Sequence, residues 1–152
     1  MLEMIAMDIT LSAAEMPHQD DASATAGDRR TMPFSITTIR EFSAAHQLRL
    51  YDGSMEPLHG HNWRVEVTVE AEKLDAIGVV MDFHELERLL DAIIAGYHNR
   101  HLNEVAAFSS LNPSAENVAF VIATTLKLPK GLSMERVDVF ETASNKATYY
   151  PR

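Results

Sequence analysis

The sequence predicts an α+β fold with the element order strand, strand, helix, helix, strand, strand. Two strand-like segments begin the ordered part of the chain, at residues 34–42 and 63–70, and a second strand-like pair ends it, at residues 137–142 and 147–150. Between the two pairs, apolar residues recur with helical spacing. With 152 residues, 46% of them hydrophobic, the chain has enough apolar material for one packed domain.

The first two strands are predicted to form an antiparallel hairpin. The segment Phe34–Phe42 is rich in β-branched and aromatic residues, and Trp63–Glu70 alternates valine with polar residues. The long connection from Gln47 to Pro57 contains Asp52-Gly53, a dipeptide that favours tight turns. This turn returns the chain to the second strand.

The first helix is expected to begin after Asp82. An aspartate is a favourable N-cap, and Glu85 follows three residues later, as in a capping box. Apolar residues then recur every three or four positions, which is the pattern of an amphipathic helix. These apolar positions are Phe83, Leu86, Leu89, Leu90, Ile93, Ile94 and Tyr97.

The second helix is expected to be capped and started by Asn112-Pro113 and to be ended by Pro129-Lys130-Gly131. Val137–Thr142 then alternates as a third strand, and Ala147–Tyr150 can pair with it across a turn at Ser144-Asn145. The apolar face of this helix includes Val118, Val121, Ile122 and Leu126.

Residues 1–32 are predicted to be a disordered tail, and residues 33–152 to be the folded domain. The segment Met16–Asp28 is polar, with small residues and no sustained period, so it cannot bury enough apolar surface to offset the entropy of ordering. A short helix at Met1–Leu11 is an alternative for the first residues.

Composition excludes several classes of protein. The net charge of -9 argues against binding to nucleic acid or to an anionic membrane, since both need clustered lysine and arginine. The chain has no cysteine, so disulfides, thiolate metal sites and cysteine nucleophiles are impossible. No apolar run is long enough to span a bilayer, and Glu3 and Asp8 occupy the region where a signal peptide carries basic residues. We therefore expect a cytoplasmic protein.

Three histidines form the strongest candidate site. His59 and His61 are two residues apart at the start of the second strand, so their side chains share the face of Trp63. His46 follows the first strand with the same parity as Phe42. Three neutral imidazoles can bind zinc and leave its fourth position open, as in catalytic sites. The alternative is two pocket histidines and one unrelated histidine.

A set of short motifs runs in order across residues 34–150. The motifs are Phe42-Ser43-Ala44-Ala45-His46, His59-Gly60-His61-Asn62-Trp63, Gly78-Val79-Val80-Met81-Asp82-Phe83, His101-Leu102-Asn103, Asn112-Pro113-Ser114-Ala115-Glu116-Asn117 and Glu141-Thr142. Together with the element order, they resemble the 6-pyruvoyl-tetrahydropterin synthase and 6-carboxy-tetrahydropterin synthase family.

The resemblance implies the tunnelling fold, in which a four-stranded antiparallel sheet carries two helices on one face. Three subunits then join their sheets into a barrel, and two trimers stack into a hexamer. The same resemblance implies a zinc ion held by His46, His59 and His61, and a small-molecule pterin as substrate.

Glu141 is the candidate anchor for the pterin ring. A carboxylate that shares a face with Val137 and Val139 is costly unless it finds donors, and in the family the matching glutamate binds two adjacent donors of the pterin. The alternative is that Glu141 is an acid exposed at a sheet edge. We also include its neighbour Thr142 in the candidate binding set. Ser114 and Glu116 are further candidates, although both residues also suit the first turn of a helix.

Two departures from the family pattern bear on activity. The family's cysteine lies four residues before the first histidine of His-Gly-His, and Met55, which cannot take up a proton, occupies that position. The family's Asp-His pair, which relays protons, falls on His98 and Asn99. His98 or His101 could serve as a substitute relay, or they could be histidines that favour the C-terminal end of a helix.

Glu56, three residues before His59, is a compensating feature. A branch of the family carries a glutamate in this Glu-X-X-His-Gly-His spacing and is associated with cleavage of the dihydroneopterin triphosphate side chain to 6-hydroxymethyl-dihydropterin. Two hypotheses follow. The chain is either a zinc-dependent lyase with Glu56 as its base, or a catalytically silent relative that binds a pterin or serves assembly.

Overall fold

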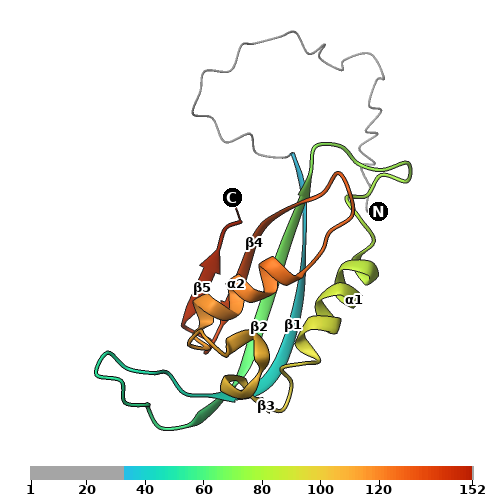
Figure 1. Cartoon of the computed structure of the whole chain (residues 1–152). Coiled ribbons are helices and arrows are strands. Elements are labelled where there is room, and N and C mark those ends of the chain that lie inside the picture. The colour runs from blue at the N-terminus through green and yellow to red at the C-terminus, as the bar shows by residue number, and fades with distance from the viewer. Residues whose placement is uncertain (1–32, 152) are drawn as a thin grey trace, which may run out of the picture. The chain divides into compact units, whose positions relative to one another are not determined.

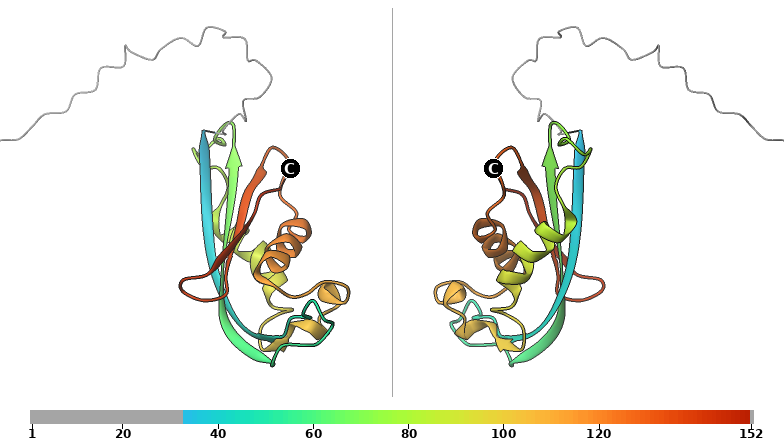
Figure 2. Two further views of the ribbon diagram at one scale, coloured as in Figure 1. Left: turned by 90° about the vertical axis from the view of Figure 1, so that its left-hand side faces the viewer. Right: turned by 90° about the vertical axis from the view of Figure 1, so that its right-hand side faces the viewer.

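The computed structural model describes residues 33–151, so the expected tail and the alternative helix at Met1–Leu11 lie outside the described residues. One five-stranded sheet, in the order β3-β1-β2-β4-β5, carries both helices on the same face (Figures 1 and 2). The elements are β1 (Phe34–His46), β2 (His59–Ala71), α1 (Phe83–Ile94), β3 (Arg100–His101), two short 3₁₀ turns (Leu102–Glu104 and Ala106–Phe108), α2 (Ala115–Thr125), β4 (Ser133–Phe140) and β5 (Lys146–Tyr149).

The pair β1–β2 is the longest part of the sheet, and its register determines the site. The two strands are antiparallel, with Phe42 opposite Trp63 and His46 opposite His59. Residues directly opposite each other share a face, so the apolar residues and these histidines all point toward the helices. The fully buried side chains on this face include Trp63, Val65, Val67 and Val69 from β2, and Val137 and Val139 from β4.

Strand β4 ends earlier than the alternation of residues 137–142 predicts. Its last residue is Phe140, because the chain then turns and the Glu141 backbone N–H donates to the Asn145 carbonyl. Glu141 and Thr142 therefore belong to the turn between β4 and β5. Strand β5 covers Lys146–Tyr149, close to the predicted segment.

The helices begin at favourable caps. The Asp82 carboxylate accepts from the His84 backbone N–H at the start of α1, as predicted, and Leu86, Leu90 and Ile94 are buried. Phe83 is 51% exposed, so its expected place on the apolar face is wrong; it lies in the first turn, before the helix packs on the sheet.

The start of the second helix also differs from the prediction. The N-cap of α2 is Ser114, whose hydroxyl accepts from the Asn117 backbone N–H, and the side chain of Asn112 is bonded to a loop instead. No helix in the described part of the chain is long and apolar enough to cross a membrane.

The fifth strand, β3, was not predicted. It pairs in parallel with Ala44 and Ala45 of β1, whereas the expected sheet was four-stranded and antiparallel. Asn99 takes a left-handed conformation, with φ of 57°, and its N–H donates to the Ser43 carbonyl. Asparagine tolerates this conformation better than most residues. A two-residue strand has no alternation for a sequence pattern to reveal.

Candidate metal centre

Three histidines meet where β1 ends and β2 begins. His46 and His59 are directly opposite each other, and His61 is opposite Ala44. The ring centroids are 4.6 Å apart for His46 and His59, 5.2 Å for His46 and His61, and 4.9 Å for His59 and His61. The structure therefore brings together all three predicted ligands on one face.

Backbone carbonyls orient two of the rings. His46 Nδ1 lies 2.8 Å from the Pro113 carbonyl oxygen, and His59 Nδ1 lies 2.8 Å from the Pro57 carbonyl oxygen. A carbonyl can only accept, so each Nδ1 carries the proton and each Nε2 has a lone pair. This arrangement is the usual support of a metal-binding histidine.

Glu141 completes the cluster. Its Oε1 lies 2.9 Å from His46 Nε2 and 3.5 Å from His61 Nε2, and both of these nitrogens are buried without a hydrogen-bond partner. Because His46 Nε2 has a lone pair, its approach to a carboxylate oxygen brings two acceptors together. A positive charge, from a bound cation or a second proton, is needed to stabilise such a contact.

The electrostatics of His61 suit a neutral ligand. Burial lowers the pKa of His61, and the neighbouring His46 and His59 lower it further, which together outweigh the opposite effect of the Glu141 and Glu56 carboxylates. A neutral imidazole is the form that coordinates a metal.

The donor set fits zinc. One ligand atom from each of His46, His59, His61 and Glu141 lies within 4.8 Å of the others. Imidazole nitrogens and carboxylate oxygens are ordinary zinc ligands, and three histidines suffice for a site with an open position. The buried, unpartnered Nε2 atoms of His46 and His61 give an independent reason to place a cation there.

Glu56 lies at the edge of this cluster. Its Oε1 accepts from the Leu48 backbone N–H at 2.8 Å and is 3.9 Å from His59 Nε2. The Glu56 N–H also donates to the Leu48 carbonyl oxygen, so two bonds fix the residue across the loop. The carboxylate is therefore held beside the histidines and is not free in solvent, as a surface loop residue would be.

Two asparagines hold the loop in place, and the sequence reasoning missed their role. The Asn103 amide bonds to both the N–H and the carbonyl of Gln47, at 3.1 and 2.7 Å. The Asn112 amide bonds to both groups of Arg49, at 2.9 and 3.0 Å. Each side chain thus pairs with the loop as a neighbouring strand would. Their presence in the Leu-Asn and Asn-Pro motifs was the available signal.

The predicted pterin-binding residues divide into two groups. Glu141, Ser114 and Glu116 line one cavity of about 240 Å³, between the start of α2 and the turn after β4. Thr142 does not line it; its hydroxyl accepts from the backbone N–H groups of Ser144 and Asn145 and thereby stabilises the turn.

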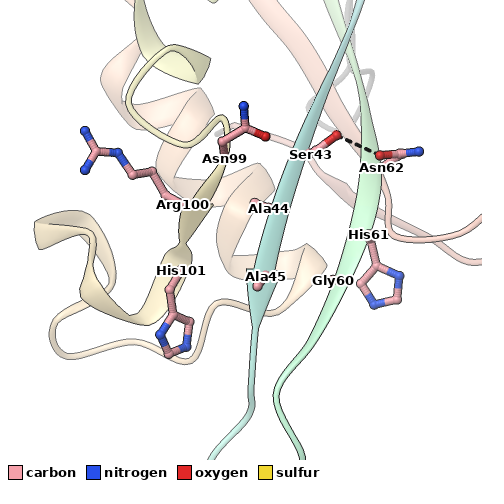
Figure 3. Close-up of a pocket in the computed structure, with 9 residues that line it drawn as sticks. All are labelled: Ser43, Ala44, Ala45, Gly60, His61, Asn62, Asn99, Arg100 and His101. Carbon is pink, nitrogen blue, oxygen red and sulfur yellow. Dashed lines mark hydrogen bonds between the residues drawn. The ribbon is translucent and has the colours of Figure 1, made fainter.

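The residues at the altered family positions lie elsewhere. Met55 lines a separate cavity of about 490 Å³, on the loop side facing Asn103. His98 Nδ1 accepts from the Ser43 N–H, which attaches the turn before β3 to β1. His101 lines a third cavity of about 560 Å³ together with His61 (Figure 3). His101 thus lines a cavity together with one histidine of the cluster, and His98 is not among the residues that line this cavity.

Comparison with known proteins agrees with the resemblance. The family model described as 6-pyruvoyl tetrahydropterin synthase matches residues 35–152. The chain is 33% identical to a dihydroneopterin monophosphate aldolase of Pyrococcus furiosus over 102 residues, which cover 66% of this chain and 82% of the relative. It is 31% identical to the human 6-pyruvoyl tetrahydrobiopterin synthase over 142 residues, which cover 83% of this chain and 97% of the relative.

Solved structures confirm the predicted fold class. The Caenorhabditis elegans 6-pyruvoyl tetrahydropterin synthase superposes with a TM-score of 0.68 at 24% identity, covering 78% of this chain and 96% of that one. A Plasmodium vivax synthase, in which a catalytic glutamate is replaced by alanine, gives 0.62 at 20% identity, covering 78% and 98%. Family model, relatives and structures agree, and the chain belongs to the 6-pyruvoyl tetrahydropterin synthase family.

Proposed function

We propose that this protein is a zinc-dependent lyase that cleaves the side chain of a phosphorylated dihydroneopterin to give 6-hydroxymethyl-dihydropterin. The observation that carries the proposal is Glu56, held by Leu48 with its Oε1 3.9 Å from His59 Nε2, beside three histidines that fit zinc. A dihydroneopterin monophosphate aldolase is among the relatives, and a catalytic glutamate is named for the Plasmodium vivax synthase.

In this proposal the substrate ring binds in the cavity of about 240 Å³. Glu141 lies both in this cavity and 3.5 Å from His61 Nε2, so a ring bound there has its side chain near the histidines. A carboxylate can accept from a ring N–H and an adjacent amino group together. Ser114 and Glu116 border the same cavity at the start of α2 and offer further polar contacts.

Glu56 acts as the base in this proposal. It takes the proton from the hydroxyl on the second side-chain carbon, the bond between the first and second carbons breaks, and the second carbon leaves as an aldehyde. The bonding electron pair passes into the ring C=N bond, and protonation of the first carbon by Glu56 completes the product. When bound, zinc polarises the side-chain oxygens. His46, His59 and His61 would hold it.

Product analysis tests the proposal. The zinc-loaded protein is incubated with dihydroneopterin triphosphate and, separately, with the monophosphate, and the pterins are separated by chromatography. We expect 6-hydroxymethyl-dihydropterin and a phosphorylated aldehyde. Pterin binding without any new product would instead support the second hypothesis, a catalytically silent relative, which His98 and Asn99 at the family's relay positions favour.

Assembly of the subunits belongs to the same proposal. β3 pairs with only Ala44 and Ala45, so within the described residues the rest of that edge of β1 has no partner, and β5 forms the other edge. Exposed edges need pairing or cover. We expect a trimer or a dimer of trimers, and light scattering that showed a stable monomer at micromolar concentration would contradict this.

A further inference from the structure

The loop that carries Glu56 has little apolar packing to hold it. It joins β1 to β2 and extends beyond the end of the sheet where the histidine cluster lies (Figure 1). A loop that buries little apolar surface depends on hydrogen bonds for its position. The place of Glu56 beside the histidines therefore depends on the bonds that fix this loop. The exposed large apolar side chains of the loop are Leu50, Tyr51, Met55 and Leu58.

Leu48 is the residue that holds Glu56. The Leu48 N–H donates to Glu56 Oε1 at 2.8 Å, and the Leu48 carbonyl accepts from the Glu56 N–H at 3.0 Å. Two residues later, the Leu50 N–H donates to the Ser54 carbonyl at 2.8 Å, across the same loop. Backbone groups of successive residues in an extended chain point to opposite sides, so those of Arg49 point away from the Glu56 side of the loop.

Two side-chain amides bond to this other edge. Asn112 Oδ1 accepts from the Arg49 N–H at 2.9 Å, and Asn112 Nδ2 donates to the Arg49 carbonyl at 3.0 Å. Asn103 makes the same pair of bonds to Gln47, at 3.1 and 2.7 Å. An amide supplies a donor and an acceptor together, which an ionised carboxylate cannot do. The residues on both sides of Leu48 are thus held at both of their backbone groups.

Asn112 also connects the loop to the candidate metal centre. The carbonyl of the next residue, Pro113, lies 2.8 Å from His46 Nδ1. The Asn112 carbonyl accepts from Asn117 Nδ2 of α2 at 2.8 Å. One short piece of backbone, anchored on α2, therefore orients a predicted zinc ligand through the Pro113 carbonyl and the loop of Glu56 through the Asn112 side chain.

We propose that Asn112 is a positioning residue for Glu56. This inference rests on the proposed function, in which Glu56 is the base. Through Arg49 and Leu48, the Asn112 amide keeps Glu56 Oε1 at 3.9 Å from His59 Nε2. The amide and Arg49 both line the cavity of about 490 Å³, so without the amide the Arg49 backbone groups face this space. A displacement of about 1 Å in a reacting group can cost roughly 100-fold in rate.

The test compares two variants of the full chain. Asn112→Ala removes both side-chain bonds to Arg49 but keeps the backbone carbonyl that Asn117 binds. The control, Asp75→Ala, also removes two side-chain bonds to backbone N–H groups, in the loop at the opposite end of β2. With dihydroneopterin monophosphate as substrate, kcat should fall by about 10-fold or more in Asn112→Ala, with KM unchanged. Asp75→Ala should keep both parent values.

A double-mutant cycle separates positioning from a general loss of stability. If Asn112 acts through Glu56, Asn112→Ala should cause little further loss of kcat in the Glu56→Gln variant. The same factor of loss in both backgrounds, or turnover of Asn112→Ala at the parent rate, overturns the inference. Asn112→Asp is the second variant if the alanine variant does not fold. It keeps the size of the side chain but places a carboxylate oxygen against the Arg49 carbonyl, so it should show the same pattern.

Hydrogen exchange measured by mass spectrometry tests the loop without turnover. Peptides that cover residues 47–56 should exchange faster in Asn112→Ala than in the parent or in Asp75→Ala. Unchanged exchange overturns the inference. Faster exchange with the parent kcat contradicts positioning while leaving the lyase intact. If the parent cleaves no pterin, the lyase proposal fails, and exchange alone then decides whether Asn112 holds the loop that carries Glu56.

Discussion

Asp138 and Glu141 are two acidic residues three positions apart, and they have opposite surroundings. Asp138 is 1% exposed, on the face of the sheet away from the helices, and its carboxylate accepts from Arg136 Nε, Lys146 Nζ and the Thr148 hydroxyl. Burial by itself would raise the pKa of Asp138, but these hydrogen bonds outweigh it and hold the pKa below its ordinary value. This carboxylate has all its partners within the chain.

Glu141 instead faces a nitrogen of His46 that cannot donate to it while the imidazole is neutral. Its Oε1 is 2.9 Å from His46 Nε2, which has a lone pair because Nδ1 donates to the Pro113 carbonyl. The comparison shows how a structural acid can be told from a functional one. An acid with a full set of donors stabilises the fold, whereas an acid among lone pairs requires a cation or a ligand to complete it.

The largest effect is expected from His59→Ala. The change removes one of three imidazole ligands. Removing only a hydrogen-bond partner of such a ligand lowers metal affinity by roughly 10–100-fold, so the loss of the ligand itself should lower zinc affinity further. The control is His84→Ala, because His84 is 90% exposed on α1. Competition with a chromophoric chelator measures the affinity. If both variants held zinc equally well, the cluster around Glu141 would not be the metal site.

Glu56→Gln should separate chemistry from binding. Glutamine keeps an oxygen for the Leu48 N–H but cannot act as the base, so pterin binding should persist and kcat should fall by roughly 100-fold or more. The exposed Glu72→Gln is the control. Turnover of the Glu56 variant at the parent rate would make Glu56 a structural support of the loop.

Glu141→Gln should weaken pterin binding and have little effect on the stability of the fold. An amide places a donor where the pterin offers donors, so affinity for dihydroneopterin should drop by about 10-fold or more, with little change in the free energy of unfolding. Fluorescence titration and urea unfolding measure the two quantities. Loss of zinc from this variant would show instead that Glu141 is a fourth metal ligand.

Asp138→Asn should lower the stability of the fold and leave ligand binding unchanged, and its effect should be the smallest of the four. Loss of the charge shared with Arg136 and Lys146 should lower the free energy of unfolding by about 1–2 kcal/mol at neutral pH, while ligand affinity stays constant. The folded pKa of Asp138 lies below the ordinary 3.8, so its contribution is present above that pH and is lost as the pH falls through the folded value. Urea unfolding of parent and variant should therefore converge in acid. A constant difference would contradict this assignment.

The sequence predicted the main elements and the metal ligands because both depend on regular spacing. Alternation in β1 and β2 places His59 and His61 on the face of Trp63, and the parity of His46 with Phe42 places the third histidine there too. The family motifs supplied the fold, and the structural comparisons confirm it.

Features that depend on irregular backbone were missed or misplaced. The left-handed conformation of Asn99 directs the chain into β3. The side-chain amides of Asn103 and Asn112 hydrogen-bond to the backbone of the loop, as a paired strand would. Neither leaves a periodic pattern in the sequence. Because β4 ends at Phe140, Thr142 lies in the following turn and not at the predicted ligand contact. Its hydroxyl there accepts hydrogen bonds from backbone N–H groups.

The metal content of the purified protein tests the central claim most directly. Elemental analysis of protein prepared without added metal should find one zinc ion per subunit, because His46, His59 and His61 bring three imidazole nitrogens within 4.8 Å of one another beside Glu141. A preparation that contained no metal and could not be loaded with zinc would contradict the account.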